Sequence, residues 1–163
     1  MIVLGIDASL RGTGLAILDW EGNRGRALHG EVVKVPQKYP HSECLRRIRD
    51  RIETLIAAHQ PAEAAIEGGF FFKNPKVALV LGEVRGTVIS SCAVAAVPVY
   101  EYSPRRAKQN VTGWGAAPKD QVARMVMAML SMPETPADDI TDAFAIALCH
   151  VHARRGLAAV TPL

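Results

Sequence analysis

Two acidic residues stand directly after short apolar runs. Asp7 follows the run 2–6, and Glu67 follows the run 64–66 and precedes two glycines. A carboxylate at the end of a buried strand can project into a cleft, where it can bind a cation or transfer a proton. Each acid also has an ordinary interpretation, as a turn-initiating Asp or as an exposed Glu before a loop. The occurrence of the same arrangement twice favours a functional pair.

A third acidic group lies where a helix is expected to begin. Asp139 and Asp142 are three residues apart and Asp138 and Asp142 are four apart, so either pair shares one helix face within a single turn. Acids in a first turn also complement the helix dipole, and we expect that role alone for one of the three. The spacing leaves open whether Asp138 or Asp139 acts together with Asp142.

Four acids that converged in one fold would repel one another, and a cation would be needed to offset the repulsion. Carboxylate oxygens are hard ligands that suit Mg²⁺ or Mn²⁺. Two such ions about 3.5 to 4 Å apart can activate a water and stabilise the leaving oxygen of a phosphodiester. We therefore predict hydrolysis that depends on two metal ions, bound by Asp7, Glu67, Asp142 and one of the pair Asp138 and Asp139.

The hydrophobic pattern predicts the elements that would carry these acids. Three antiparallel strands are expected over 1–7, 13–20 and 26–35, followed by a helix over 42–59. A strand over 62–67, a helix over 75–96 and a strand over 97–102 come next. Helices that open at Pro104 and Pro118 precede a last helix over 137–155, for which Thr135 is the expected N-cap. This order predicts an α/β fold, a mixed five-stranded sheet with helices on both faces.

Length and composition indicate one domain in a soluble protein. The 163 residues are 49% hydrophobic, which suits a single domain over 1–156 and a flexible tail over 157–163. No signal peptide is expected, and the apolar stretch 77–100 contains Glu83 and Arg85, which disfavours a membrane span. The net charge of +3 fits a polyanionic partner without requiring one. The three cysteines lack ligand spacing and are expected to be reduced packing residues: Cys44, Cys92 and Cys149.

Aromatic and basic residues near the acids could hold nucleic acid. The segment 70–73, Phe-Phe-Phe-Lys, follows Glu67 closely, and a ring there could stack on an unpaired base or belong to the core. Lys108 and Lys119 could contact phosphates or lie on solvated helix faces. The helix over 75–96 has an apolar surface too broad for one buried stripe, and Gly82 and Gly86 would permit a partner subunit to approach it.

Together these motifs resemble the RuvC family of Holliday junction resolvases, and the match covers essentially Ile2 to His152. The resemblance implies an RNase H-like fold, a homodimer, and paired symmetric nicks that resolve a four-way junction in recombinational DNA repair. The chain departs from the family pattern at 8–9, where Pro-Gly is common, and at 68–69, where a Gln usually follows the Glu. The matching motifs, in order, are Gly5-Ile6-Asp7, Thr13-Gly14, Ala65-Ile66-Glu67, Leu81-Gly82-Glu83-Val84-Arg85-Gly86, Lys108-Gln109, Lys119-x-Gln121-Val122 and Asp139-x-x-Asp142-Ala143.

The resemblance also implies roles for single residues. Asp7, Glu67, Asp139 and Asp142 fall on the family's catalytic, metal-binding positions. The implied partners are four-way junction DNA, a second copy of the chain, and the branch-migration proteins RuvA and RuvB in the bacterial cytoplasm. Phe70 matches the stacking position, Lys108 and Lys119 match phosphate-contacting positions, and Lys73 and Arg85 complete the DNA-binding residues that we predict.

Three other functions are compatible with parts of this pattern. One is a related RNase H-like nuclease that acts on RNA or on an RNA–DNA hybrid. Another is an ATP-binding domain of the actin and sugar-kinase kind, since the segment 5–9 resembles its phosphate loop, but that fold needs two domains and a longer chain. The last is a non-catalytic junction-binding protein, which would tolerate Asp7→Asn.

Overall fold

A five-stranded mixed sheet forms the centre of the computed structural model, which describes residues 1–68, 74–156 and 160–163. Its strand order is β3-β2-β1-β4-β5. The first three strands, β1 (Ile2–Asp7), β2 (Gly12–Glu21) and β3 (Arg24–Lys34), pair antiparallel. The last two, β4 (Glu63–Glu67) and β5 (Val99–Tyr102), run parallel to β1. The predicted mixed sheet is confirmed.

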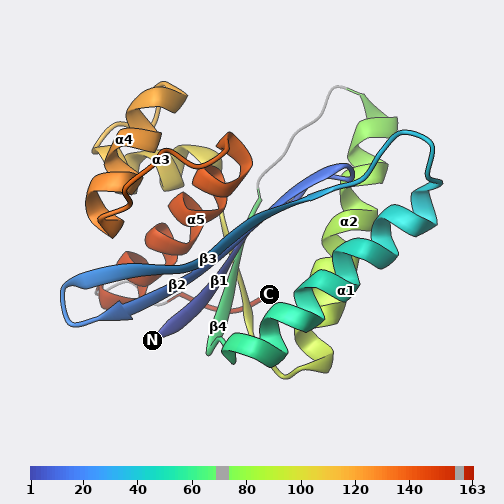
Figure 1. Ribbon diagram of the computed structural model, residues 1–163, viewed down its shortest axis with the longest axis horizontal. Coiled ribbons are helices and arrows are strands. Elements are labelled where there is room, and N and C mark those ends of the chain that lie inside the picture. Colours follow the sequence, from blue (N-terminus) through green and yellow to red (C-terminus); the bar gives the residue numbers. More distant parts are fainter. Residues whose placement is uncertain (69–73, 157–159) are drawn as a thin grey trace.

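Helices cover both faces of the sheet (Figure 1). One face carries α1 (His41–His59) and α2 (Pro75–Val94), and the other carries α3 (Pro104–Thr112), α4 (Lys119–Leu130) and α5 (Asp138–Arg155). Each face has its own apolar core, because side chains alternate across the strands. The buried cysteines belong to these cores as free thiols, as predicted.

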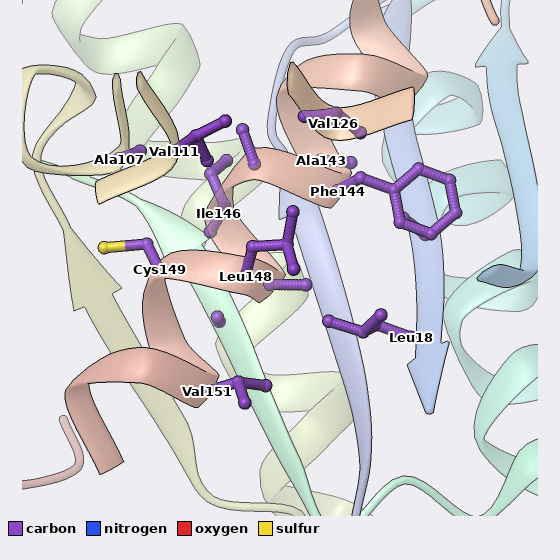
Figure 2. Packing of buried hydrophobic residues seen from close by; sticks show 14 of the residues in the cluster. Leu18, Ala107, Val111, Val126, Ala143, Phe144, Ile146, Leu148, Cys149 and Val151 are labelled. Atoms are coloured by element: carbon purple, nitrogen blue, oxygen red, sulfur yellow. The ribbon is translucent and has the colours of Figure 1, made fainter. Parts of the chain in front are cut away.

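The helix α5 is the central helix of its face. Figure 2 shows its apolar side chains directed at Leu18 on the sheet and at Val111 and Val126 on α3 and α4. Residues 143–151 of α5 are buried without interruption. A helix enclosed in this way can shift little along the sheet. The acids on its first turns therefore keep a fixed position relative to the strand ends.

Two glycines allow α5 to lie directly on the sheet. A Cβ atom on Gly5 in β1 would lie 2.1 Å from the carbonyl oxygen of Ala143, and one on Gly14 in β2 would lie 2.0 Å from that of Asp139. Any side chain at these positions would therefore push α5 outward. The close approach places the start of α5 beside the end of β1.

The structure shows contacts that the sequence did not indicate before α5 and in the C-terminal tail. Thr135 does not cap α5: the N-cap is Ala137, and the Thr135 hydroxyl instead contacts the Met127 sulfur at 3.1 Å. The tail was expected to be flexible, yet Val160 packs against the core and the Leu163 amide donates to the Val99 carbonyl at 2.8 Å. Residues 157–159 of that tail lie outside the described part of the chain.

Candidate active site

Asp7 and Glu67 lie at the ends of two neighbouring parallel strands. The register pairs Ile6 of β1 with Ile66 of β4, so Asp7 and Glu67 follow at the same edge of the sheet. Both strands end here because polar and small residues replace the apolar run: Ala8-Ser9 after β1 and Gly68 after β4. The two side chains are partly exposed, in contrast to the buried residues that precede them.

The first turns of α5 add the remaining acids. Asp142 lines one cavity of about 320 Å³ together with Asp7, Glu67, Lys108 and Lys119. Asp139 lies beside this cavity, on the β2 side, with its Oδ2 atom 3.4 Å from where a Cβ on Gly12 would be. Three of the four predicted acids thus share one cavity, and the fourth adjoins it.

Asp138 has a different environment from Asp139. Its side chain is 73% exposed, and its carboxylate lies 3.8 Å from the Lys119 ammonium. Asp139 instead belongs to the charges that raise the pKa of Asp7, and Asp138 is not among them. This geometry supports Asp139 as the partner of Asp142.

Burial and mutual repulsion perturb the acids. Burial raises the pKa of Asp7 to about 7, and the charges of Glu67, Asp142 and Asp139 add to the effect. Burial and the charge of Asp142 likewise raise the pKa of Glu67. A carboxylate with a pKa near 7 is partly protonated at neutral pH, so this cavity favours any additional positive charge.

Lysines from the two neighbouring helices supply part of that charge. The Lys119 ammonium donates to Asp142 Oδ2 at 3.3 Å, and Asp142 is the main cause of a raised Lys119 pKa. The charge of Lys119 lowers the pKa of Asp7, and those of Lys108 and Lys119 lower that of Glu67. Lys108 and Lys119, which the sequence predicted to lie near the acids, therefore line the same cavity as them.

The donor set fits a hard divalent cation by its chemistry. Several carboxylates, partly withdrawn from water and repelling one another, surround one cavity that phosphate-sized groups can enter. Within residues 1–68, 74–156 and 160–163, no three acidic, His or Cys side chains already converge as ligands.

The other predicted DNA-binding residues have different outcomes. Phe70 and Lys73 lie outside the described residues. Arg85 is not a free surface cation: its guanidinium hydrogen-bonds to the Glu67 carbonyl oxygen and to Glu101. Both bonds direct the Arg85 charge into the protein, and its contact with DNA stays a prediction.

Sequence reasoning missed Glu101 and the close packing around Gly68. Glu101 stands between Tyr100 and Tyr102 in a four-residue strand. Its neighbours pack on the α5 face, so the alternation of a strand places Glu101 on the α2 side. In the sequence, this alternation is the signal that could have placed Glu101 on the α2 side. It does not identify Arg85 as the ion-pair partner of Glu101.

A mixed sheet with acids at the ends of adjacent strands, completed by acids from a helix across them, defines a metal-dependent nuclease of the RNase H-like fold. A family model described as crossover junction endodeoxyribonuclease RuvC matches residues 3–150. The chain belongs to this family. Membership makes it a nuclease, which sets aside the ATP-binding and non-catalytic alternatives.

Similar proteins agree with this assignment. The RuvC of Idiomarina loihiensis is 43% identical over 160 residues, covering 96% of this chain and 90% of the relative. That of Halorhodospira halophila is 43% identical over 152 residues, covering 93% and 90%. The structure of T. thermophilus RuvC in complex with Holliday junction substrate matches with a TM-score of 0.92 and 37% identity, covering 100% and 99% of the two chains.

A more distant structure shares the fold alone. The yeast mitochondrial Holliday junction resolvase Ydc2 is 13% identical and matches with a TM-score of 0.66, covering 90% of this chain and 76% of its own. At this identity the likeness concerns the arrangement of sheet and helices. The RNase H-like architecture predicted from the sequence is confirmed.

Proposed function

We propose that this protein resolves Holliday junctions in recombinational DNA repair by two symmetric nicks. The observation that carries the proposal is the cavity in which Asp7, Glu67 and Asp142 meet Lys108 and Lys119. Acids there can hold metal ions against a phosphodiester, while lysines can hold its flanking phosphates. Family membership and the junction-bound relative support the same substrate.

Mg²⁺ or Mn²⁺, two per site, is the cofactor that we propose. Asp7, Glu67 and Asp142 would hold the ions, with Asp139 in support. Bound ions of this kind activate a water and stabilise the leaving oxygen of a phosphodiester. Asp7 must lose its proton to act as a ligand, so its pKa of about 7 makes metal binding weaker at acidic pH.

The lysines have a distinct task in this proposal. The side chain of Lys119 is 62% exposed, so it can turn from Asp142 toward a phosphate. Lys108 lies on α3, lines the same cavity and lowers the pKa of Glu67 by its charge. Two cations on separate helices can hold the backbone on either side of the cleaved bond.

Salt dependence tests these phosphate contacts. Lys108→Ala and Lys119→Ala should each weaken junction binding and reduce the slope of log affinity against log salt by about one unit. Binding is measured in Ca²⁺, without cleavage, over a range of salt concentrations. The matched control is Arg49→Ala on α1, across the sheet from the cavity, where the slope should stay unchanged. An unaltered slope in either lysine variant would remove that lysine from the interface.

The preferred substrate separates this proposal from a nuclease for RNA or for hybrids. A mobile four-way DNA junction, a linear duplex and an RNA–DNA hybrid of the same sequence are incubated with the protein and Mg²⁺ or Mn²⁺. We expect efficient cleavage of the junction alone. Equal or faster cleavage of the hybrid would favour the ribonuclease alternative.

A homodimer through α2 is the assembly that we propose. Leu79 is 67% exposed and Val94 is 85% exposed, and α2 has the length and mean hydropathy of a membrane span although only 22% of that window is buried. Apart from their chain neighbours and the adjacent backbone of α2 itself, no atom of the described residues lies within 4 Å of a Cβ built on Gly82 or Gly86. An apolar helix face that stays exposed in one copy suits a second copy, and a two-fold dimer presents two sites to a symmetric junction.

Disruption of this face should separate the subunits. Leu79→Glu is expected to shift the protein from dimer to monomer in analytical ultracentrifugation, because it introduces a charge into an apolar contact. The control is Met125→Glu on α4, which is also exposed and should leave the dimer intact. A Leu79→Glu protein that stays fully dimeric would place the interface elsewhere.

The remaining partners and the setting follow from the family. We propose that RuvA and RuvB act on the same junction and that the protein works in the bacterial cytoplasm as one domain over 1–156. The bacterial relatives act on DNA, which supports this location.

A further inference from the structure

An arginine from α2 reaches the end of the strand that carries Glu67. Arg85 Nη1 donates to the backbone carbonyl oxygen of Glu67 at 2.9 Å. Its Nη2 atom donates to Glu101 Oε2 on β5 at 2.5 Å. The side chains of Arg85 and Glu101 are 24% and 32% exposed. Three elements, α2, β4 and β5, therefore meet at one backbone group next to a proposed metal ligand.

Glu101 also packs against the residue that follows Glu67. A Cβ atom on Gly68 would lie 2.0 Å from Cδ and 2.1 Å from Oε1 of Glu101, so the carboxylate occupies the space of a side chain at position 68. The Gly68 amide donates to the Tyr102 carbonyl at 3.0 Å. The carbonyl of Glu67 and the amide of Gly68 are thus both held, and the peptide between them cannot rotate freely.

The arrangement acts on the backbone of Glu67 more than on its charge. Among the described residues that line the cavity, Arg85 is absent. The charges that shift the Glu67 pKa belong to Asp142, Lys108 and Lys119, and Arg85 is not among them. Since a side chain leaves its backbone in a direction set by the local dihedral angles, a fixed peptide fixes the direction of the Glu67 Cα–Cβ bond and limits where its carboxylate can reach.

We propose that Arg85 and Glu101 are positioning residues, whose ion pair holds the end of β4 so that Glu67 faces Asp7 and Asp142. The inference rests on the proposed function of Glu67 as a catalytic metal ligand. It also links the site to α2, the helix proposed to form the subunit interface. Contacts that support a ligand indirectly typically contribute 10- to 100-fold, roughly, to activity or metal affinity.

Three substitutions test the pair from different sides. Arg85→Lys keeps the charge but cannot form both hydrogen bonds, and Glu101→Gln keeps the shape but removes the charge. Gly68→Ala adds a methyl group where Glu101 lies, and this flexible carboxylate must move away from Arg85. Each variant should lower the single-turnover cleavage rate on saturating junction by roughly 10- to 100-fold. Junction affinity in Ca²⁺ should stay within about two-fold of wild type, since neither residue of the pair lines the cavity that the acids share.

Two further readouts do not depend on cleavage. Hydrogen exchange of the Gly68 amide should become faster in Arg85→Lys and Glu101→Gln, because the peptide is released. The double variant should cleave no more slowly than the worse single variant, since both residues act through one contact. The control is Arg49→Lys, since the exposed Arg49 side chain pairs with Glu53 at 3.1 Å. This variant should change neither the cleavage rate nor the exchange of the Gly68 amide.

The outcomes distinguish this inference from the others. Wild-type rates and unchanged exchange in all three variants would overturn the positioning role while the proposed function stands. Weaker junction binding with a smaller salt slope in Arg85→Lys, without any effect of Glu101→Gln, would instead restore the DNA-contact role expected from the sequence. A wild-type protein that does not nick junctions would refute the proposed function, and the exchange measurement would still report on the contact.

Discussion

Asp7→Asn is expected to abolish junction cleavage and, without metal, to raise stability at neutral pH. The cleavage rate should fall by roughly 1,000-fold or more, the factor that about 4 kcal/mol of lost transition-state stabilisation produces. Stability should rise because Asn carries no charge in a cavity where burial, Glu67 and Asp142 already disfavour the ionised Asp7. The same substitution is thus expected to lower activity and to raise stability.

The stability difference should depend on pH in a defined window. The Asp7 pKa is about 7 in the folded protein and 3.8 by reference, so between these values the folded state binds more protons than the unfolded state. Wild-type stability therefore decreases as pH rises from about 4 to 7, by at most about 4 kcal/mol from this group. The advantage of Asp7→Asn should be absent near pH 4 and complete above pH 7.

Thermal unfolding in EDTA from pH 4 to pH 8 measures this difference. Addition of Mg²⁺ or Mn²⁺ should then raise the melting temperature of wild type more than that of Asp7→Asn, because the ion binds the folded acids. A clear loss of stability in metal-free Asp7→Asn at pH 8 would instead identify Asp7 as a structural cap of the turn after β1.

Gly5→Ala should destabilise the protein strongly although it adds a single methyl group. The new Cβ would lie 2.1 Å from the Ala143 carbonyl oxygen and 2.9 Å from the Ala147 Cβ. A backbone oxygen cannot rotate away as a side chain can, so α5 must move off β1. We expect a loss of about 3 kcal/mol in the free energy of unfolding. Asp142 would move with the helix, and cleavage should fall even where the protein remains folded.

Chemical denaturation of Gly5→Ala and of Gly156→Ala gives a matched comparison. In the control, the added Cβ would lie 3.4 Å from the Ala153 carbonyl oxygen, close to ordinary contact, and stability should change by less than about 0.5 kcal/mol. An equally small change in Gly5→Ala would show that α5 can shift freely. The close packing of α5 on β1 would then not determine where Asp142 lies.

Much of the fold could be predicted because its signals are local. Apolar alternation and proline positions predicted the strands and helices to within a few residues, as in β1 and α2, although for α3 and α4 only the starts were predicted. Asp7 and Glu67 could be predicted because each ends a strand in the same way, and the parallel pairing of β1 with β4 then places them at the same edge of the sheet. The Thr135 cap was wrong, since the Thr135 hydroxyl contacts Met127 instead. The flexible tail stays a prediction, and the sequence did not indicate the hydrogen bond from Leu163 to Val99.

The remainder of the site depends on contacts between elements, which periodicity does not encode. Spacing alone could not separate Asp138 from Asp139; the surroundings on β2 and near Lys119 make the difference. Arg85 was predicted to contact DNA because the sequence shows its charge but not its hydrogen-bond partners inside the protein. One partner is a backbone carbonyl, which leaves no trace in the sequence, and the other is Glu101, 16 residues away.

The most direct test of the central claim is a time course of cleavage on a mobile four-way junction with separate labels on opposite strands. With Mg²⁺ or Mn²⁺, the wild-type protein should produce paired nicks at symmetric positions on two strands of like polarity, and Asp7→Asn should produce none. Absence of paired nicks with either metal, or equal cleavage by Asp7→Asn, would contradict resolution of junctions at this cluster of acids.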